Sequence, residues 1–490
     1  MATLSSALNY ALSGLSVSSA QSALLSRNVS FASDENYSRR TAEIITLPGG
    51  AASVGTYGRS MDKRLLDKLL EAAGSAAGRQ VVFDALSRLG ATIGDPEDDG
   101  SLSAMIGSMQ NSLKIFEADP ANNALGASAI EAARALADKL NGISAEIITV
   151  REDADQAMSG SVDRINTLLG QFKIVNDAVV RGSGTAADLG DSLDQRDSIL
   201  KMLSDEIGIR VVTRSNNDIS IYAEGGAVLF EGSPRSVSFA ATANLHNGAP
   251  GNAVFVDGVP VTGPASAMPV SSGKLAALAS VRDEAALVFQ RQADEAAAAL
   301  MRNFAESDQG DPPVGPDIAG LFIDDGGGAL PVPGLTPPGL ASRIAINPLA
   351  DPTGGGNPML LRDGGFGGSS YVYNGSGSAA FQARITALAQ SFDTVTSFDP
   401  AAGLGTAASL KAFSIQSASW VEAQRQTAQL QASAAGALKA RASESLLRVT
   451  GVNIDQEMAA LLDLEKTYQA SSKIISVVDS MLASLMEAVR

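Results

Sequence analysis

The residues that could do chemistry in this chain are few, and their spacing argues against a catalytic or metal site. His246 is the only histidine and cysteine is absent, which removes thiolate metal sites and thiol nucleophiles. One imidazole without cysteine makes neither a zinc site of the usual kind nor a Cys–His pair. A Ser–His–Asp arrangement would need a serine on a strand–turn–helix elbow, and no serine has that context. We therefore predict no catalytic residue and no metal site.

Two acidic loops and one glycine-rich loop are interpreted as solvated surface. The acidic segments 95–99 and 324–325 lack the alternating oxygen ligands and the distal carboxylate of a calcium loop. The segment 364–368, Gly-Gly-Phe-Gly-Gly, follows no strand, and no Lys-Ser or Lys-Thr opens a helix behind it, so phosphate binding is not predicted. The sequence thus predicts no cofactor.

Composition points to a helix- and loop-rich protein of several domains. The 490 residues suffice for two to four domains. Only 5% of the residues are aromatic although 45% are apolar, whereas a compact enzyme usually carries more aromatic residues in its core. The net charge of −17, without a basic cluster, disfavours nucleic acid and anionic membranes as partners. Residues 1–26 contain no Lys or Arg and no continuous apolar core, unlike a cleavable secretory signal.

Both ends of the chain show the apolar periodicity of long amphipathic helices. The C-terminal stripe follows an a/d heptad over about five repeats, and Gly451 and Asn453 mark a break and an N-cap just before it. Such a stripe usually packs inside its own domain. Here it is long, thin and placed at the chain ends, which favours neighbours on several sides. The predicted subunit-interface residues are Leu4, Leu8, Leu15, Leu25 and Val29 at one end, and Ile454, Leu461, Leu464, Tyr468, Ile475, Val478, Leu482, Leu485 and Val489 at the other.

Between the ends the pattern changes from helix to strand and back. Residues 62–204 have helical periodicity, 209–270 have β periodicity with Asn, Gly and Pro turns, and 310–377 are rich in Gly and Pro. We also predict a helix at 273–304 and a further helical stretch at 381–447. We predict a mainly α fold with β inserts, in which the long terminal helices pair as a coiled-coil-like stem. The predicted domains are a terminal helical stem (1–50 with 451–490), a helical middle domain (51–206, 273–306 and 380–450), a β module (207–272) and a variable Gly/Pro-rich module (307–379).

One segment resembles the motif that follows the first helix in flagellar rod, hook and hook-associated proteins. That motif begins with Asn and an aliphatic residue and ends in Gly, Tyr, Ser and Arg. This chain departs from it at residues 31, 33 and 34. It has Asn36 at the glycine position, and Asn is the residue other than Gly that best tolerates a left-handed backbone. The matching residues include Asn28, Tyr37, Ser38 and Arg39.

Further segments narrow the resemblance to the hook-associated protein 1 family, whose members join hook to filament. Residues 188–197, ending in Asp194, Gln195, Arg196 and Asp197, are similar to that family's "LLDQRD" segment. Residues 449–457 resemble the start of that family's C-terminal helix. Residues 273–278 are similar in sequence to the start of another of its helices. The four motifs stand in the family's order, whereas 310–377 show no such likeness.

The resemblance implies a non-enzymatic structural subunit of the flagellum. It implies an inner layer of terminal helices, a second layer of central helices and outermost β modules. It also implies type III export without cleavage and an extracellular position at the hook–filament junction. The implied partners are further copies, hook protein, the second hook-associated protein, and a cytoplasmic chaperone that holds the C-terminal helix before export.

Three other interpretations remain open. The chain is similar enough to axial proteins in general that a hook, distal-rod or filament subunit is the nearest alternative. A flagellum-borne wall hydrolase would need a pair of carboxylates in a cleft, and no sequence motif indicates such a pair. A secreted adhesin would use the module at 310–377.

Overall fold

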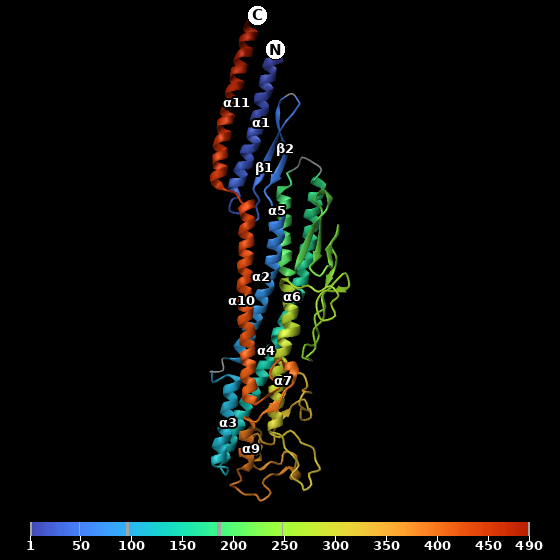
Figure 1. Cartoon of the computed structure of the whole chain (residues 1–490), viewed down its shortest axis with the longest axis vertical. Coiled ribbons are helices and arrows are strands. Elements are labelled where there is room, and N and C mark those ends of the chain that lie inside the picture. Colours follow the sequence, from blue (N-terminus) through green and yellow to red (C-terminus); the bar gives the residue numbers. More distant parts are fainter. Residues whose placement is uncertain (1, 49, 95–97, 184–187, 247, 489–490) are drawn as a thin grey trace.

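The computed structural model describes residues 2–48, 50–94, 98–183, 188–246 and 248–488. The molecule is long and narrow, and both chain ends lie at the same tip (Figure 1). That tip is formed by two long helices, α1 (Ala2–Ser30) and α11 (Ile454–Ala488), beside a hairpin of β1 (Arg40–Thr46) and β2 (Ala52–Arg59). We call α1, the hairpin and α11 the stem. No helix in the described ranges combines the length and hydropathy needed to cross a bilayer.

The body below the stem is a bundle of long helices. They are α2 (Lys63–Ile93), α3 (Leu102–Ala118), α4 (Asn123–Gly182), α5 (Gly190–Glu206), α6 (Gly273–Ser280), α7 (Ala286–Asn303) and α10 (Leu410–Thr450). Side chains of Asp62, Ser101, Asn122 and Ser409 cap four of these helices by accepting backbone N–H groups of the first turn. The 60 residues of α4 make a rod of about 90 Å. This rod ties the two ends of the body together.

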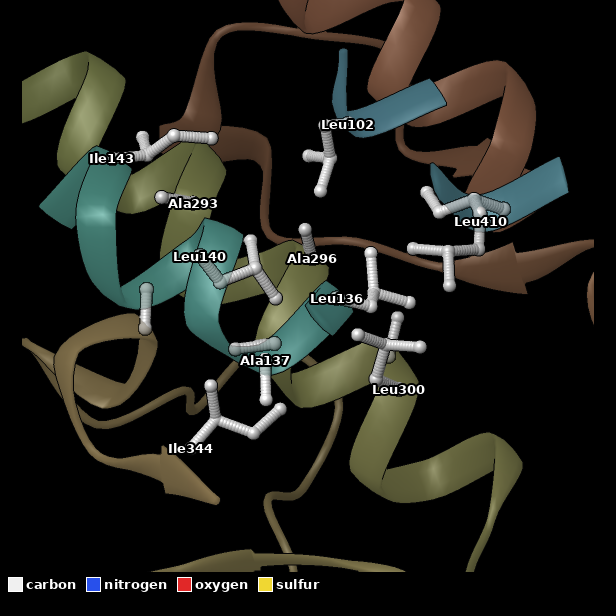
Figure 2. Close-up of a cluster of buried hydrophobic side chains, with 14 of the residues drawn as sticks. Leu102, Leu136, Ala137, Leu140, Ile143, Ala293, Ala296, Leu300, Ile344 and Leu410 are labelled. Carbon is white, nitrogen blue, oxygen red and sulfur yellow. The ribbon is translucent and has the colours of Figure 1, made fainter. Parts of the chain in front are cut away.

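The lower core is built mostly from α4 and α7. Leu136 and Leu140 of α4 meet the small side chains Ala293 and Ala296 of α7, so the two helices approach closely (Figure 2). Leu102 of α3, Ile344 and Leu410 close the same cluster from other elements, and all of these side chains are buried.

The upper core joins the other half of α4 to the β module. Phe172 of α4 packs edge-on against Phe230, with ring centroids 4.9 Å apart. The module contains two antiparallel three-stranded sheets. One consists of β3 (Ile209–Thr213), β4 (Ile219–Ala223) and β5 (Val228–Phe230), and the other of β6 (Val237–Ser238), β7 (Phe255–Val256) and β8 (Val259–Pro260).

The Gly/Pro-rich region forms short elements on the lower end of the body. They are β9 (Phe322–Asp324) paired with β10 (Ile344–Ile346) and the single turn α8 (Leu360–Asp363). The residues between this region and α10 form α9 (Ala383–Ser391), and β11 (Thr396–Ser397) paired with β12 (Ala407–Ala408). Local carboxylates hold the loops of the Gly/Pro-rich region: Asp308 accepts the backbone N–H groups of Gly310, Val314 and Gly315.

The mainly α fold with β inserts is confirmed, but three details differ from the sequence prediction. The stem contains the β1–β2 hairpin, whose bulge at residues 43–44 disturbs the register. The predicted helix at 273–304 is interrupted by one π-helical turn (Val281–Ala285), where the Arg282 carbonyl accepts a hydrogen bond from Arg151. The predicted helical stretch 381–447 begins instead as α9, two short strands and loops.

Two glycines of α2 allow close packing against the α5–α6 junction. A Cβ on Gly78 would lie 2.9 Å from the Gly273 carbonyl oxygen, and one on Gly74 would lie 2.9 Å from that of Ser204. These neighbours are backbone atoms, which cannot rotate away. By contrast, a Cβ on Gly160 of α4 would meet nothing within 4 Å.

We therefore predict opposite effects for one substitution at two helical glycines. Gly160→Ala raises thermal stability by about 0.5–1 kcal/mol, because alanine loses less backbone entropy in a helix. Gly78→Ala lowers it, because the clash with the α6 backbone outweighs that gain. Thermal unfolding followed by circular dichroism measures both, and equal stabilisation by the two variants would contradict the packing described.

Candidate functional site

The stem helices run antiparallel with one continuous register. A Cβ on Gly14 of α1 would lie 3.7 Å from Ser471 Oγ of α11. Fourteen residues further along α1, Asn28 Nδ2 donates to Glu457 Oε2 at 2.9 Å, fourteen residues back along α11. Glycine and serine at the contact let the helices pack closely, so the seam itself is thin.

The predicted interface residues lie in or beside this seam to different degrees. Leu25 and Val478 are buried, whereas Ile454 and Tyr468 are about half exposed. The side chains of Leu4 and Leu485, and Val489 as a whole, lie outside the described residues. Partly buried positions complete the stripe: Leu8, Leu15, Val29, Leu461, Leu464, Ile475 and Leu482.

The stem also carries much of the exposed apolar surface. Fifteen of the 29 large apolar side chains that are exposed in the described part of the chain belong to residues 10–57 and to α11. On α11 they include Ile474, Val477 and Met481, which follow one another at helical spacing and are each about half exposed. A groove of about 360 Å³ opens between the helices, lined by Ser18, Ser22 and α11 side chains from Met458 to Tyr468. Contiguous apolar surface of this kind marks interaction sites.

A buried polar cluster holds the base of α11 to α1 and the hairpin. The Glu457 carboxylate is fully buried, and it accepts from Asn28 Nδ2 at 2.9 Å and from Arg39 Nε at 2.5 Å. The amide oxygen of Asn28 accepts from the Tyr37 hydroxyl at 2.8 Å and from the Arg40 backbone N–H at 3.0 Å. We call Asn28, Tyr37, Arg39 and Glu457 the stem node.

A second cluster fastens the hairpin to α5. The Asp194 carboxylate receives Arg40 Nη2 at 2.6 Å, Arg59 Nη1 at 2.8 Å and the Ser38 backbone N–H at 3.1 Å. Arg59 Nη2 also lies 2.7 Å from Asp197 Oδ2. We call Arg40, Arg59, Asp194 and Asp197 the body node. The Arg40 guanidinium lies against Gly190, where a Cβ would be only 2.2 Å away, so the glycine of this motif is required by space.

Burial and charge act in opposite directions on the acids around the body node. Burial raises the pKa of the Asp197 carboxyl, and the nearby Arg59 guanidinium opposes that rise. Burial also acts to raise the pKa of Asp191, but hydrogen bonds from Arg27 and Arg40 hold it below its usual range. Arg27 and Asp191 form an ion pair across the exposed edge.

The four predicted family-motif residues of α5 divide between two places. Asp194 and Asp197 belong to the body node, while Gln195 is exposed. Arg196 points to Asn217, donating to its backbone carbonyl at 2.6 Å, and burial lowers its pKa to about 10. In the motif loop, Asn36 is not among the described non-glycine residues with positive φ, so this turn does not use the left-handed backbone expected at that position.

Two family models and several curated proteins match parts of this chain. A family model described as the flagellar hook-associated protein FlgK helical domain matches residues 86–311, and one described as the flagellar basal body rod FlgEFG protein C-terminal matches 444–488. Flagellar hook-associated protein 1 of Salmonella typhimurium is 27% identical over 250 residues, and that of Escherichia coli is 26% identical over 248.

The middle of this chain is thus similar to flagellar hook-associated protein 1. The matched region is 47% of the chain and only 43% of the Salmonella relative and 44% of the Escherichia coli relative, so the chain spans less than half of these curated relatives. The flagellar hook junction protein FlgK from Burkholderia pseudomallei has the same fold, with a TM-score of 0.57 at 13% identity over 77% of this chain and 99% of that one.

The sequence motifs predicted one side of each polar cluster and did not reveal the other. Asn28, Tyr37, Ser38 and Arg39 were identified as one motif and Asp194 and Asp197 as another, and the structure brings both motifs to the base of the stem. Glu457, Arg40 and Arg59 were not singled out. A usable signal existed for Glu457, which puts a carboxylate at a heptad d position where Leu, Ser and Val follow.

We predict that Asp194→Ala costs about 3–5 kcal/mol of stability around the hairpin, because it leaves the buried Arg40 guanidinium without its principal counter-charge. The matched control is Asp191→Ala, whose side chain is 70% exposed and whose loss costs about 0–1 kcal/mol. Hydrogen exchange of residues 40–59 and thermal unfolding measure both. Similar small effects for the two variants would contradict the body node's role.

Proposed function

We propose that this chain is a structural subunit that joins the flagellar hook to the filament, assembled through its stem after type III export. The observation that carries the proposal is the stem's unburied apolar surface, since α1 and α11 pair with each other and still leave Ile474, Val477 and Met481 half exposed. The match to the hook-associated protein's helical domain and the fold shared with the Burkholderia hook junction protein support the junction role.

Physical chemistry favours a stem completed by neighbouring copies. Burying one Leu, Ile or Val gains about 1.5–3 kcal/mol, whereas ordering a residue costs about 1–2 kcal/mol of backbone entropy. A helix pair that leaves large apolar side chains such as Val477 and Met481 half exposed therefore gains little by itself. A head-to-tail arrangement covers the outer faces with other copies and continues as a helical tube.

The division of the chain follows the same logic. We propose the stem (1–50 with 451–490) as the polymerising layer, the helical middle domain (51–206, 273–306 and 380–450) as a second layer, and the modules at 207–272 and 307–379 as the outer surface. No enzymatic role is proposed. The proposed partners are hook protein and the second hook-associated protein, outside the cell, at either end of the junction.

The C-terminal match supports axial proteins more broadly. Residues 444–488 match a model named for rod proteins, so this segment alone favours any axial position. The match at 86–311 is named for the hook-associated protein's helical domain, and it favours the junction over a hook, rod or filament subunit.

We predict that Val477→Asp blocks junction assembly without unfolding the subunit. The side chain is about half exposed, so the charge is tolerated in the monomer but becomes costly when a neighbouring copy covers it. The assay is filament formation and electron microscopy in cells that lack the natural chain, alongside thermal unfolding of the purified variant.

The matched control is Ser476→Asp, which puts the same charge on the adjacent exposed position, away from the apolar face. Filaments should form with this variant. Truncation from Leu461 onward should leave the body folded and abolish assembly. Normal filaments on cells carrying the truncated chain would contradict the proposal.

A cytoplasmic chaperone is proposed to cover α11 before export by taking its apolar face into a groove. Leu482→Asp should then weaken chaperone binding about tenfold or more, since a lost Leu contact of about 1.5–3 kcal/mol exceeds the 1.4 kcal/mol of one decade. Calorimetric titration of the chaperone with this variant measures the change. An affinity equal to that of Ser476→Asp would remove the chaperone from the proposal.

A further inference from the structure

Glu457 is an unusual residue for its position in α11. It occupies the d position of the first heptad, and the later d positions hold Leu464, Ser471 and Val478. Its carboxylate is nevertheless fully buried, and it forms an ion pair with Arg39. A buried polar group in a heptad seam is a known means of fixing register between helices.

The rest of the seam offers weaker constraints on the register. On α1 the rows beside α11 repeat every seven residues: Ala11, Ser18 and Leu25; Leu8, Leu15, Ser22 and Val29; and Ala7, Gly14, Gln21 and Asn28. Most of these side chains are small or aliphatic, so sliding α11 by one heptad again sets small and aliphatic side chains against Leu, Ile and Val. Asn28, which contacts Glu457, is the buried polar exception, and a buried polar contact is a known means of fixing register.

The connection between α10 and α11 is a short loop, because only residues 451–453 separate the two helices. Four peptide steps from Thr450 to Ile454 span up to about 14 Å when extended. A one-heptad slip moves α11 by about 10.5 Å, so the loop and the contacts of Glu457 both bear on the register, and the cross-linking test below measures the share of Glu457.

The partners of Glu457 are fixed by independent contacts. Asn28 is held by the backbone N–H of Arg40 and the hydroxyl of Tyr37. The backbone of Arg39 donates to the Thr450 carbonyl at 2.7 Å, at the end of α10. The carboxylate thus meets a donor from α1 and a donor from the following loop at once, and a slipped helix would lose both.

We propose that Glu457 is the register-determining residue of the stem: its buried contacts to Asn28 and Arg39 select one of several otherwise similar alignments of α11 on α1. This inference rests on the proposed assembly role of the stem, because the register decides which apolar side chains each copy presents to its neighbours. It is tested within one chain, without assembly.

The absence of cysteine makes the register directly measurable. Three paired variants of the full-length chain, at dilution where it is monomeric, report the alignment by disulfide formation. Gly14→Cys with Ser471→Cys reports the observed register, because the glycine's Cβ position lies 3.7 Å from Ser471 Oγ. Gly14→Cys with Leu464→Cys or with Val478→Cys reports a slip of one heptad in either direction.

The expected result is a loss of selectivity when Glu457 becomes apolar. With Glu457 present, only the 14–471 pair cross-links. With Glu457→Leu, the 14–464 or 14–478 pair cross-links to an extent comparable with 14–471. Glu457→Gln retains an oxygen that accepts from Asn28 or Arg39 and keeps the 14–471 preference. Exclusive 14–471 cross-linking in Glu457→Leu overturns the proposal.

One control separates slipping from fraying. Gly14→Cys with Ser476→Cys probes a position outside the heptad seam, and it should stay uncross-linked when α11 slides as a helix. Cross-linking at position 476 as readily as at 464 and 478 would mean a melted helix and would overturn the proposal.

A second variant carries the test if Glu457→Leu does not fold. Arg39→Gln changes a partly exposed side chain and removes one of the two donors, so selectivity for the 14–471 pair should fall. Unchanged exclusive cross-linking would overturn the proposal. Filament formation is scored separately: a chain that keeps its register yet fails to assemble speaks against the proposed function and leaves the register assignment standing.

Discussion

The position of the stem on the body depends on a few buried charged side chains that meet at the base of the stem. The stem node ties α11 to α1 through Glu457, and the body node ties the hairpin to α5 through Asp194. Arg39 and Arg40 are adjacent in sequence and serve one node each, so the two clusters share a backbone. Removing one partner of such a buried pair is costly, and the pairs therefore fix the direction of the stem relative to the body.

The apolar contacts between α1 and α11 differ from these polar clusters, because they bury little surface. At the seam, Gly14, Ser18 and Ser471 bring α1 and α11 close together but bury little surface. Larger side chains such as Val477 and Met481 lie on the outside of the pair. The polar nodes thus supply the geometry of the stem, and the exposed faces supply surface for association between copies. The net charge of −17 opposes indiscriminate association of free chains.

Periodicity in the sequence was enough to predict the long terminal helices, because a heptad depends only on spacing along one chain. The motifs around Asn28 and Asp194 were also visible, but not the fact that they lie side by side, 166 residues apart in sequence. The partners Arg40 and Arg59 escaped notice because a single arginine in a strand carries no local pattern that distinguishes an ion pair from a solvated charge. Contacts of this kind follow only from the three-dimensional fold.

The hairpin and the Gly/Pro-rich region were harder for a related reason. Residues 40–59 alternate weakly, since neither face of a two-stranded sheet in the stem is fully buried. In the region around Asp308 and Asp351 the backbone is held by side-chain carboxylates and short turns, and such local bonds leave no period to detect.

The central claim is that the stem is completed by neighbouring copies, and amide hydrogen exchange tests it most directly. The account predicts that residues 2–30 and 454–488 form the helix pair in the purified monomer but exchange faster than α4 and α7, and that the same ends become strongly protected in assembled junctions. Equal, strong protection of both ends in the monomer and in the assembly would contradict it.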